Sequence, residues 1–379
     1  METGTVSLEG ASAQYSFLRD GEGNWIQFYY AIVPDKPEHI AEQVDTIEGA
    51  ERALFDSLGI PQDAVVAKRL FSSDLINHRD ALLGYKERSG ADFYFSTTEQ
   101  PPVSAVKLAV LGMCLDNITA KFRDENVFCC DTTSGIRHIF VEHLVDPDPA
   151  GTSEEQTERI FAALGAKLAL HGATIESNVL RTWLYAPHVD ADYPGIVKAR
   201  KNLFDALNLT QETHYIASTG IQGGTGDPFA RVCMDAYAVT GLDQAGIRYI
   251  QAPEYLSPTH IYGVTFERAT AIRMADVDFL FISGTASIDD KGDVVHPGDV
   301  VKQTQRTLVN IAALLTSAGF SEGDLSSFIV YLRDPVDYGF VEPLIGEYAG
   351  DLPAVFVAAP VCRPGWLIEI EATAARLAG

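Results

Sequence analysis

An internal repeat constrains the fold of this chain more than any other feature of its sequence. Two amphipathic segments begin with QTER at 156–159 and QTQR at 303–306, and each reaches a glycine at the same distance, Gly172 and Gly319. Apolar residues recur in both at three- and four-residue spacing, and a glycine just past the last of them suits a left-handed C-cap. Both segments are therefore predicted to be helices that pack on one face.

The elements after each helix repeat in the same order. A run rich in aromatic and β-branched residues follows, VLRTWLYAP at 179–187 and SSFIVYLRDP at 326–335, then a second helical segment and two closing strands. The first third carries the pattern in weaker form, with Gln43 and Gly59 at the spacing of Gln303 and Gly319. The chain is predicted to be an α+β protein of three tandem units, at 1–130, 131–245 and 246–379. The segment 241–270 is longer than a usual connection and is interpreted as a linker or a lid over a site.

Charge and composition limit the classes of partner. A net charge of −24 disfavours extended binding to nucleic acid or to an anionic membrane, since both are polyanions. The chain lacks a run of about 18 apolar residues and an N-terminal signal peptide, so the cytoplasm is the expected location. Five cysteines, an odd number without a C-x-x-C pair, argue against a disulfide framework and a zinc ribbon. No metal and no organic cofactor are expected.

The third unit resembles the RidA (YjgF) family over residues 262–377. The resemblance rests on ISGT at 282–285, a G-D-x-x-x-Q-T helix start at 298–304, VYLRD at 330–334 and IEIEA at 368–372. RidA proteins are homotrimers with active sites between subunits. The resemblance therefore implies three RidA-like units that form a pseudo-trimer within one chain, either as a monomer or as a higher homo-oligomer.

One departure from the RidA pattern points to a particular branch of the superfamily. RidA imine deaminases carry an arginine after a proline-alanine pair, where it binds the substrate carboxylate, but Val355 follows that pair here. The segment from Cys362-Arg363 to Glu369-Ile370-Glu371 instead resembles C-R-x-x-x-L-x-E-x-E of the chorismatases, which remove pyruvate from chorismate. Segments SGTASI at 283–288, HPGD at 296–299, FERA at 266–269 and ASTGI at 217–221 also resemble that family. Leu184 replaces an asparagine expected in its R-x-W-N-Y-x-P strand, and 259–263 differ from its proline-rich form.

Two glutamates of this segment are the first candidates for catalysis and binding. Glu369 and Glu371 are two residues apart on a strand and so face the same way, although such pairs often simply face water. Cleavage of a vinyl ether, such as the enolpyruvyl group of chorismate, needs a carboxylic acid that stays neutral near pH 7, and burial raises a pKa in that direction. The resemblance implies that Glu369 is this acid.

A dianionic substrate also needs fixed cations, which arginine supplies through paired hydrogen bonds. Arg363 is the first candidate. Arg231 occupies the corresponding hairpin of the second unit, and an interface between units is expected to bring the two arginines together. Further residues are expected to bind the substrate, namely Arg181, Tyr185 and Glu371. Cys362 is interpreted either as a small apolar wall or as a catalytic determinant of the product, 3-hydroxybenzoate or a dihydroxycyclohexadiene carboxylate.

Three functions are therefore weighed. The leading one is a chorismatase-like lyase or hydrolase that acts on chorismate or a close relative. The second is a tandem RidA-type deaminase or hydrolase for another small carboxylate, which the departures at Leu184 and 259–263 favour. The third is a non-catalytic protein that binds a small metabolite between its units.

Overall fold

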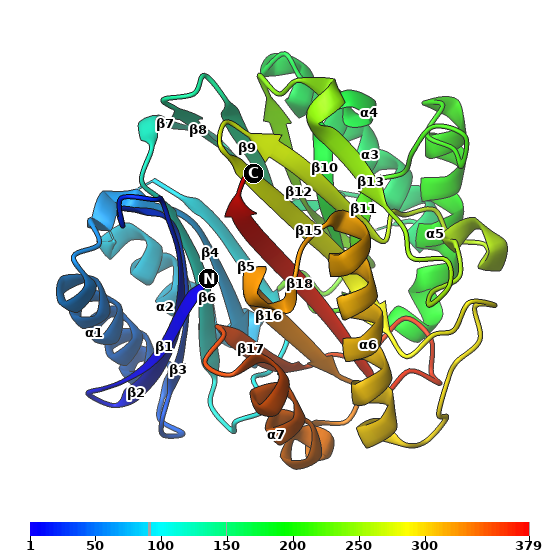
Figure 1. The fold of residues 1–379 in the computed structure, drawn as a ribbon. Helices are drawn as coiled ribbons and strands as arrows, with labels where there is room; N and C mark the ends of the chain where they lie inside the picture. Colours follow the sequence, from blue (N-terminus) through cyan, green and yellow to red (C-terminus); the bar gives the residue numbers. More distant parts are fainter. Residues whose placement is uncertain (90–91, 149, 379) are drawn as a thin grey trace.

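The computed structural model describes residues 1–89, 92–148 and 150–378, which form three six-stranded mixed sheets (Figure 1). In spatial order, the strands of the first sheet are β1 (Glu2–Leu8), β2 (Ala11–Arg19), β3 (Trp25–Pro34), β6 (Leu108–Leu115), β4 (Val65–Ser72) and β5 (Tyr94–Glu99). Those of the second are β11 (Ala217–Gln222), β10 (Val179–Ala186), β12 (Cys233–Thr240), β9 (Arg137–Val145), β8 (Val127–Thr132) and β7 (Ile118–Asp124). Those of the third are β13 (Ile247–Ile250), β14 (Ala269–Met274), β15 (Val277–Ala286), β18 (Ile368–Leu377), β16 (Leu325–Leu332) and β17 (Ala354–Ala358).

The helices cover the outer faces of the sheets, while the sheets face one another around the centre (Figure 1). The α-helices are α1 (Ile40–Leu58), α2 (Leu75–Arg88), α3 (Ser153–Leu170), α4 (Ile175–Asn178), α5 (Val189–Ala206), α6 (Val300–Ala318) and α7 (Tyr338–Ala349). Short 3-10 helices are η1 (Gln62–Ala64), η2 (Gln244–Gly246), η3 (Thr259–Tyr262), η4 (Glu322–Asp324) and η5 (Pro335–Asp337). No helix of the described residues is long and apolar enough to cross a membrane.

Helix α6 shows how the sequence determines these elements. Its apolar positions Leu308, Ile311 and Leu315 are buried, as their helical spacing predicts. The helix begins where the side chain of Asp299 accepts a hydrogen bond from the backbone N–H of Lys302, and it ends at Gly319 in the left-handed conformation, with φ of 78°. The predicted C-cap is therefore confirmed.

The prediction of three tandem α+β units is confirmed, although the limits of the sheets differ from the expected divisions. The sheet changes between β6 and β7, so the division at 130 falls inside β8, because β7 and β8 form a hairpin that pairs with β9. The segment 241–270 holds all of β13 and the start of β14, which pair with each other. Only its middle part, 251–268, is a long connection with η3.

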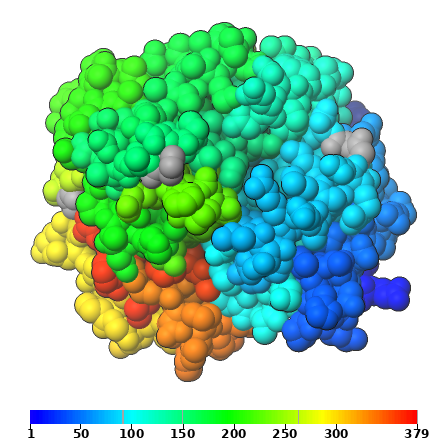
Figure 2. Space-filling view, turned by 180° about the vertical axis from the view of Figure 1, so that it is seen from behind, coloured from blue at the N-terminus to red at the C-terminus, as the bar shows by residue number. Residues whose placement is uncertain are grey.

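The three sheets pack against one another through a cluster of aromatic residues at the centre. Phe140 stacks on Tyr237 with ring centroids 4.7 Å apart and on Tyr94 at 5.0 Å, and Tyr237 meets Phe281 edge-on at 5.5 Å. These four residues come from all three sheets. Seen from behind, the three differently coloured thirds of the chain share one continuous surface (Figure 2). The pseudo-trimer is therefore held by a common core as well as by its covalent links.

Candidate active site

Glu369 lies at the start of β18 with only 4% of its surface exposed, and it lines a pocket between the second and third units. The space between its walls, open solvent included, is about 490 Å³. Helix α5 and strand β11 of the second unit form one side. Strand β15, the connection before β14 and the turn before β18 form the other. Its remaining lining residues are Tyr193, Arg200, Ser218, Gly220, Val264, Phe266, Arg268, Gly284, Ala286, Ile288, Cys362, Arg363 and Trp366.

The carboxyl group of Glu369 is packed directly against the backbone of β15. A Cβ atom at Gly284 would lie 2.1 Å from Oε1 of Glu369, so only glycine leaves room for the carboxyl group in this position. Burial raises the pKa of Glu369 to about 8, and the negative charge of Glu371 acts in the same direction. Glu369 is therefore a neutral carboxylic acid near pH 7.

Three arginines line the same pocket. Arg200 is 1% exposed and its Nε and Nη1 contact the hydroxyls of Thr265 and Ser218, both at 3.3 Å. Its Nη2 has no hydrogen-bonding partner among the described residues. Arg268 donates to the backbone carbonyl of Ser257 at 2.7 Å.

The third arginine, Arg363, lies over the ring of Trp366, 5.2 Å from its centroid. Three guanidinium groups beside one neutral acid make the pocket strongly cationic. It suits a small molecule that carries carboxylates.

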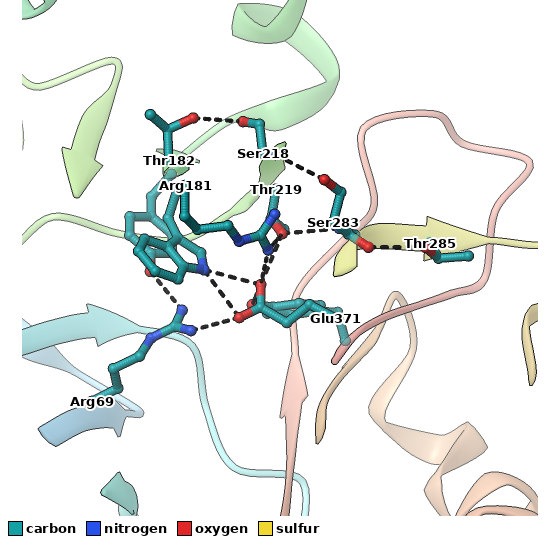
Figure 3. Close-up of polar contacts among 12 residues, drawn as sticks. Arg69, Arg181, Thr182, Ser218, Thr219, Ser283, Thr285 and Glu371 are labelled. Carbon is teal, nitrogen blue, oxygen red and sulfur yellow. Dashed lines mark hydrogen bonds and ion pairs between the residues drawn. The ribbon is translucent and has the colours of Figure 1, made fainter. Parts of the chain in front are cut away.

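Glu371, two residues further along β18, is the centre of a buried network that joins all three units (Figure 3). Its Oε1 accepts hydrogen bonds from Nη1 of Arg69 at 2.6 Å and from Nε1 of Trp183 at 3.0 Å. Its Oε2 accepts from the hydroxyls of Thr219 at 2.8 Å and Tyr331 at 2.9 Å, and from Nη2 of Arg181 at 3.1 Å. The first unit contributes Arg69, the second three donors and the third Tyr331.

The network fixes the charge of Glu371. Burial alone would raise its pKa, but the positive charges of Arg69 and Arg181 and the hydrogen bonds from Arg69 and Trp183 lower it to about 2. Thr219 extends the network to the pocket, because its hydroxyl also accepts from the backbone N–H of Gly284 at 3.1 Å. Adjacent glutamates on one strand face are thus held in opposite charge states, which is the pattern expected of an acid and its supporting carboxylate.

The structure brings together only some of the residues that the sequence singled out. Cys362, Arg363 and Glu369 line one pocket. Arg181, Tyr185 and Glu371 lie instead in the junction network, where the hydroxyl of Tyr185 accepts from Nη2 of Arg69 at 2.8 Å. A direct role of these three residues in substrate binding stays a prediction. The Tyr185 hydroxyl and the Glu371 carboxylate already have protein partners, whereas Nη1 of Arg181 has none among the described residues.

The expected meeting of Arg231 and Arg363 does not occur, because the two residues line different pockets. Nη1 of Arg231 contacts Asp192 at 3.3 Å and its Nε donates to the backbone carbonyl of Gly151 at 3.0 Å. The physical reason is the pseudo-threefold arrangement. The closing hairpin of each unit faces the preceding unit, so equivalent residues of the second and third units lie at different interfaces.

Sequence reasoning missed two arginines of the pocket. Arg268 lies in the FERA segment, which carried the family resemblance but gave no indication of its role. Arg200 lies in the KARK run of α5, where a buried cation cannot be distinguished from the solvated lysines beside it. The signal that could have identified it is its spacing of four residues from the buried Ile196, which places it on the inner face of the helix.

The strand registers explain why the three interfaces differ. The pairings of β4 with β6, β10 with β12 and β16 with β18 each begin with a β-bulge. Residue pairs at the same distance from the bulge are equivalent in the three units, and one such set is Phe71 with Ala109, Tyr185 with Cys233, and Tyr331 with Glu369. The position of the acid is thus a methyl group in the first unit and a thiol in the second. Both Ala109 and Cys233 are buried. A carboxylic acid occupies this position in the third unit alone.

The thiol of Cys362 also lines the pocket. Burial raises the pKa of the Cys362 thiol to about 12, so the thiol stays protonated and is a poor nucleophile. Among the described residues, no group of three or more His, Cys, Asp or Glu side chains is arranged to hold a metal ion.

Comparison with known proteins separates the third unit from the whole chain. The family model described as Endoribonuclease L-PSP matches residues 269–376. A RutC family protein of Pyrococcus horikoshii is 40% identical over 99 residues, which are 26% of this chain and 79% of that protein. The 3-aminoacrylate deaminase RutC of Acinetobacter baylyi is 34% identical over 99 residues, with 26% and 79% covered.

Two further proteins match this chain beyond the third unit. The 3-hydroxybenzoate synthase of Streptomyces hygroscopicus is 27% identical over 250 residues, which are 59% of this chain and 70% of that protein. A crystal structure of a chorismatase superposes with a TM-score of 0.64 at 19% identity and covers 82% of this chain and 93% of its own. The fold of that chorismatase is therefore shared by all three units.

Proposed function

Because this chain belongs to the family of the RutC and Endoribonuclease L-PSP proteins, and because its three-unit fold is shared with a chorismatase, we propose that it removes pyruvate from chorismate or a close relative. The 3-hydroxybenzoate synthase relative supports the same reaction. The observation that carries the proposal is Glu369, a buried acid with a pKa of about 8 in a pocket lined by three arginines.

The reaction begins with proton transfer from Glu369. Protonation of the terminal methylene carbon of the enolpyruvyl group produces an oxocarbenium ion, and the carboxylate left on Glu369 stabilises that cation. In the hydrolytic route, water adds to the cation and the hemiketal collapses to pyruvate and a dihydroxycyclohexadiene carboxylate. In the other route, the ring loses the side chain as pyruvate without net addition of water and becomes 3-hydroxybenzoate. Both routes balance. Pyruvate and 3-hydroxybenzoate together contain the same atoms as chorismate, and the hydrolytic products contain those atoms plus one water.

The arginines explain how so acidic a protein binds a dianion. Arg200 and Arg363 lie on opposite sides of the pocket, on the second and third units, and each presents a guanidinium group suited to a carboxylate. Arg200 has an unpartnered Nη2 among the described residues, a buried donor that a substrate carboxylate would satisfy. Cys362 forms part of the wall and stays a candidate determinant of which product forms.

The deaminase alternative rests on the similarity of the third unit to the RutC deaminase. The position where a RidA deaminase carries its carboxylate-binding arginine is Val355 here, and this side chain is buried at 1% exposure in β17. The chain therefore lacks that contact, and the arginines of the pocket come from other positions.

Pyruvate release from chorismate tests the proposal. We expect the wild-type chain to release pyruvate and Glu369→Gln to lose at least about a hundredfold in kcat/KM, because the amide cannot donate the proton. Glu267→Gln is the matched control: it removes another buried carboxyl with a raised pKa, one that does not line the pocket. No pyruvate from the wild-type chain at any enzyme concentration would reject chorismate. Ammonia release from small imino acids, and ligand binding without turnover, would then test the two alternatives.

A further inference from the structure

A second cavity lies at the centre of the molecule, where the three sheets face one another. The space between its walls, open solvent included, is about 830 Å³, and it shares no lining residue with the pocket of Glu369. Aromatic side chains from all three units form most of its wall, among them Tyr29, Tyr94, Phe140, Trp183, Tyr237 and Phe279. The cavity therefore exists only where the three units meet, and each unit contributes part of its wall.

Three residues that line this otherwise apolar space carry buried polar atoms without partners. Among the described residues, Nη1 of Arg181, Nε of Arg69 and Oε1 of Gln27 are buried and have no hydrogen-bonding partner. The three side chains belong to residues that are 2%, 9% and 4% exposed. Leaving a buried donor unpaired costs about 1–3 kcal/mol, and more for a charged group. Two arginines that line one cavity therefore each keep a guanidinium N–H group that an added acceptor would satisfy.

The charges around the cavity determine the sign of that acceptor. Arg69 and Arg181 carry two positive charges, and Glu371, bonded to both, supplies one negative charge. Burial lowers the pKa of His138 to about 4 and raises that of Tyr29 to about 12, so both are neutral near pH 7. Asp235 does not line the cavity; its carboxylate accepts hydrogen bonds from the hydroxyls of Tyr94 and Ser96. The residues that line the cavity therefore carry a net charge of +1.

We propose that the central cavity is a second binding site, which takes a small aromatic monocarboxylate. The ring would pack among the aromatic side chains, and the carboxylate would accept from Nη1 of Arg181 and Nε of Arg69. A neutral apolar ligand would leave both donors unpaired. A dianion would add a charge for which this lining has no cation.

A second hollow adjoins the cavity. It shares Leu115, His138, Met274 and Phe279 with the cavity and continues to polar residues such as Asn117 and Asp276. A ligand would therefore enter between the first, second and third sheets, away from the pocket of Glu369. A ligand bound in the cavity would affect the pocket of Glu369 through Glu371, which lines the cavity and is adjacent to Glu369 on the same strand face.

Tryptophan fluorescence gives a direct test with benzoate as the probe. The chain has three tryptophans, and only Trp183 lines the cavity, whereas Trp366 lines the other pocket. In a Trp366→Phe background, we expect benzoate to produce a saturable fluorescence change that disappears when Trp183 is also replaced by phenylalanine. Ala67→Phe, which fills the cavity from β4, should abolish the change.

The outcomes separate this proposal from the proposed function. The fluorescence titration involves no turnover, so its result does not depend on whether chorismate is a substrate. If Ala67→Phe does not fold, Met113→Phe fills the same cavity from β6 and serves in its place. No saturable change in the Trp366→Phe protein, or a change that persists when the cavity is filled, would overturn the proposal. Phenol, which has the ring without the negative charge, should bind much more weakly, and equal binding of phenol would contradict the assigned role of the arginines.

Discussion

Replacement of Glu371 by glutamine tests how the three-unit junction controls the acidity of Glu369. The two residues are on the same face of β18, so their carboxyl groups are about 7 Å apart. At an effective dielectric constant of about 20, two unit charges at this distance repel by about 2.4 kcal/mol, which corresponds to about 1.7 pKa units. The substitution removes this repulsion and leaves Arg69 and Arg181 without their counter-charge. The pKa of Glu369 should therefore fall from about 8 to about 6.

The pH dependence of kcat/KM for pyruvate release measures this shift. In the wild-type chain the activity should decline as the pH rises through about 8, because the proton that Glu369 donates is lost. In Glu371→Gln the same decline should begin nearly two pH units lower, whereas Glu267→Gln should leave it in place. Two buried guanidinium groups lose their partner, so a stability loss of about 3–5 kcal/mol is expected, and denaturant unfolding must show that the variant is folded in the assay. A decline at the wild-type pH in a folded Glu371→Gln would refute the reasoning.

Three further predictions concern the pocket. Gly284→Ala places a methyl group 2.1 Å from Oε1 of Glu369, so kcat/KM should fall by about a hundredfold or more. Activity within a few-fold of the wild type would contradict the assigned close contact. Glu369→Gln should stabilise the chain at high pH, because the wild-type carboxyl group loses its proton near pH 4.5 in the unfolded state and near pH 8 in the folded state. Wild-type stability therefore falls by about 1.4 kcal/mol per pH unit between these values. Denaturant unfolding at pH 4.5 and pH 8 should show that the variant gains stability relative to the wild type as the pH rises. With a thiol pKa of about 12, Cys362 should resist iodoacetamide at pH 8, and rapid loss of pyruvate release under these conditions would show a reactive thiolate.

The fold was predictable because its information is local and occurs three times. The spacing of Leu308, Ile311 and Leu315 and the glycine at 319 specify one helix, and the same pattern elsewhere specifies its counterparts. The position of Glu369 was also within reach, since its family segment lies in a single hairpin. The expected division at 130 differs from the limits of the sheets because the sequence of the hairpin at 118–132 fits the end of one unit and the start of the next equally well.

The network around Glu371 could not be predicted, because its contacts are not local in the sequence. Glu371 binds Arg69, which is 302 residues away in the sequence, and Arg181, which is 190 residues away. The sequence around each arginine contains no pattern that identifies its partner. Glu371 looked like a second substrate-binding group because its spacing from Glu369 sets only the face of the strand. The donors that occupy that face come from other units, and only the tertiary structure shows them.

The central claim is that Glu369 delivers a solvent-exchangeable proton to the methylene carbon of the enolpyruvyl group. The most direct measurement is to run the reaction in D2O and examine the methyl group of the pyruvate by mass spectrometry or NMR, with unlabelled pyruvate incubated alongside to measure background exchange. The account predicts one deuterium in the methyl group of each pyruvate released. Pyruvate with an undeuterated methyl group, formed at an undiminished rate, would contradict proton donation by Glu369.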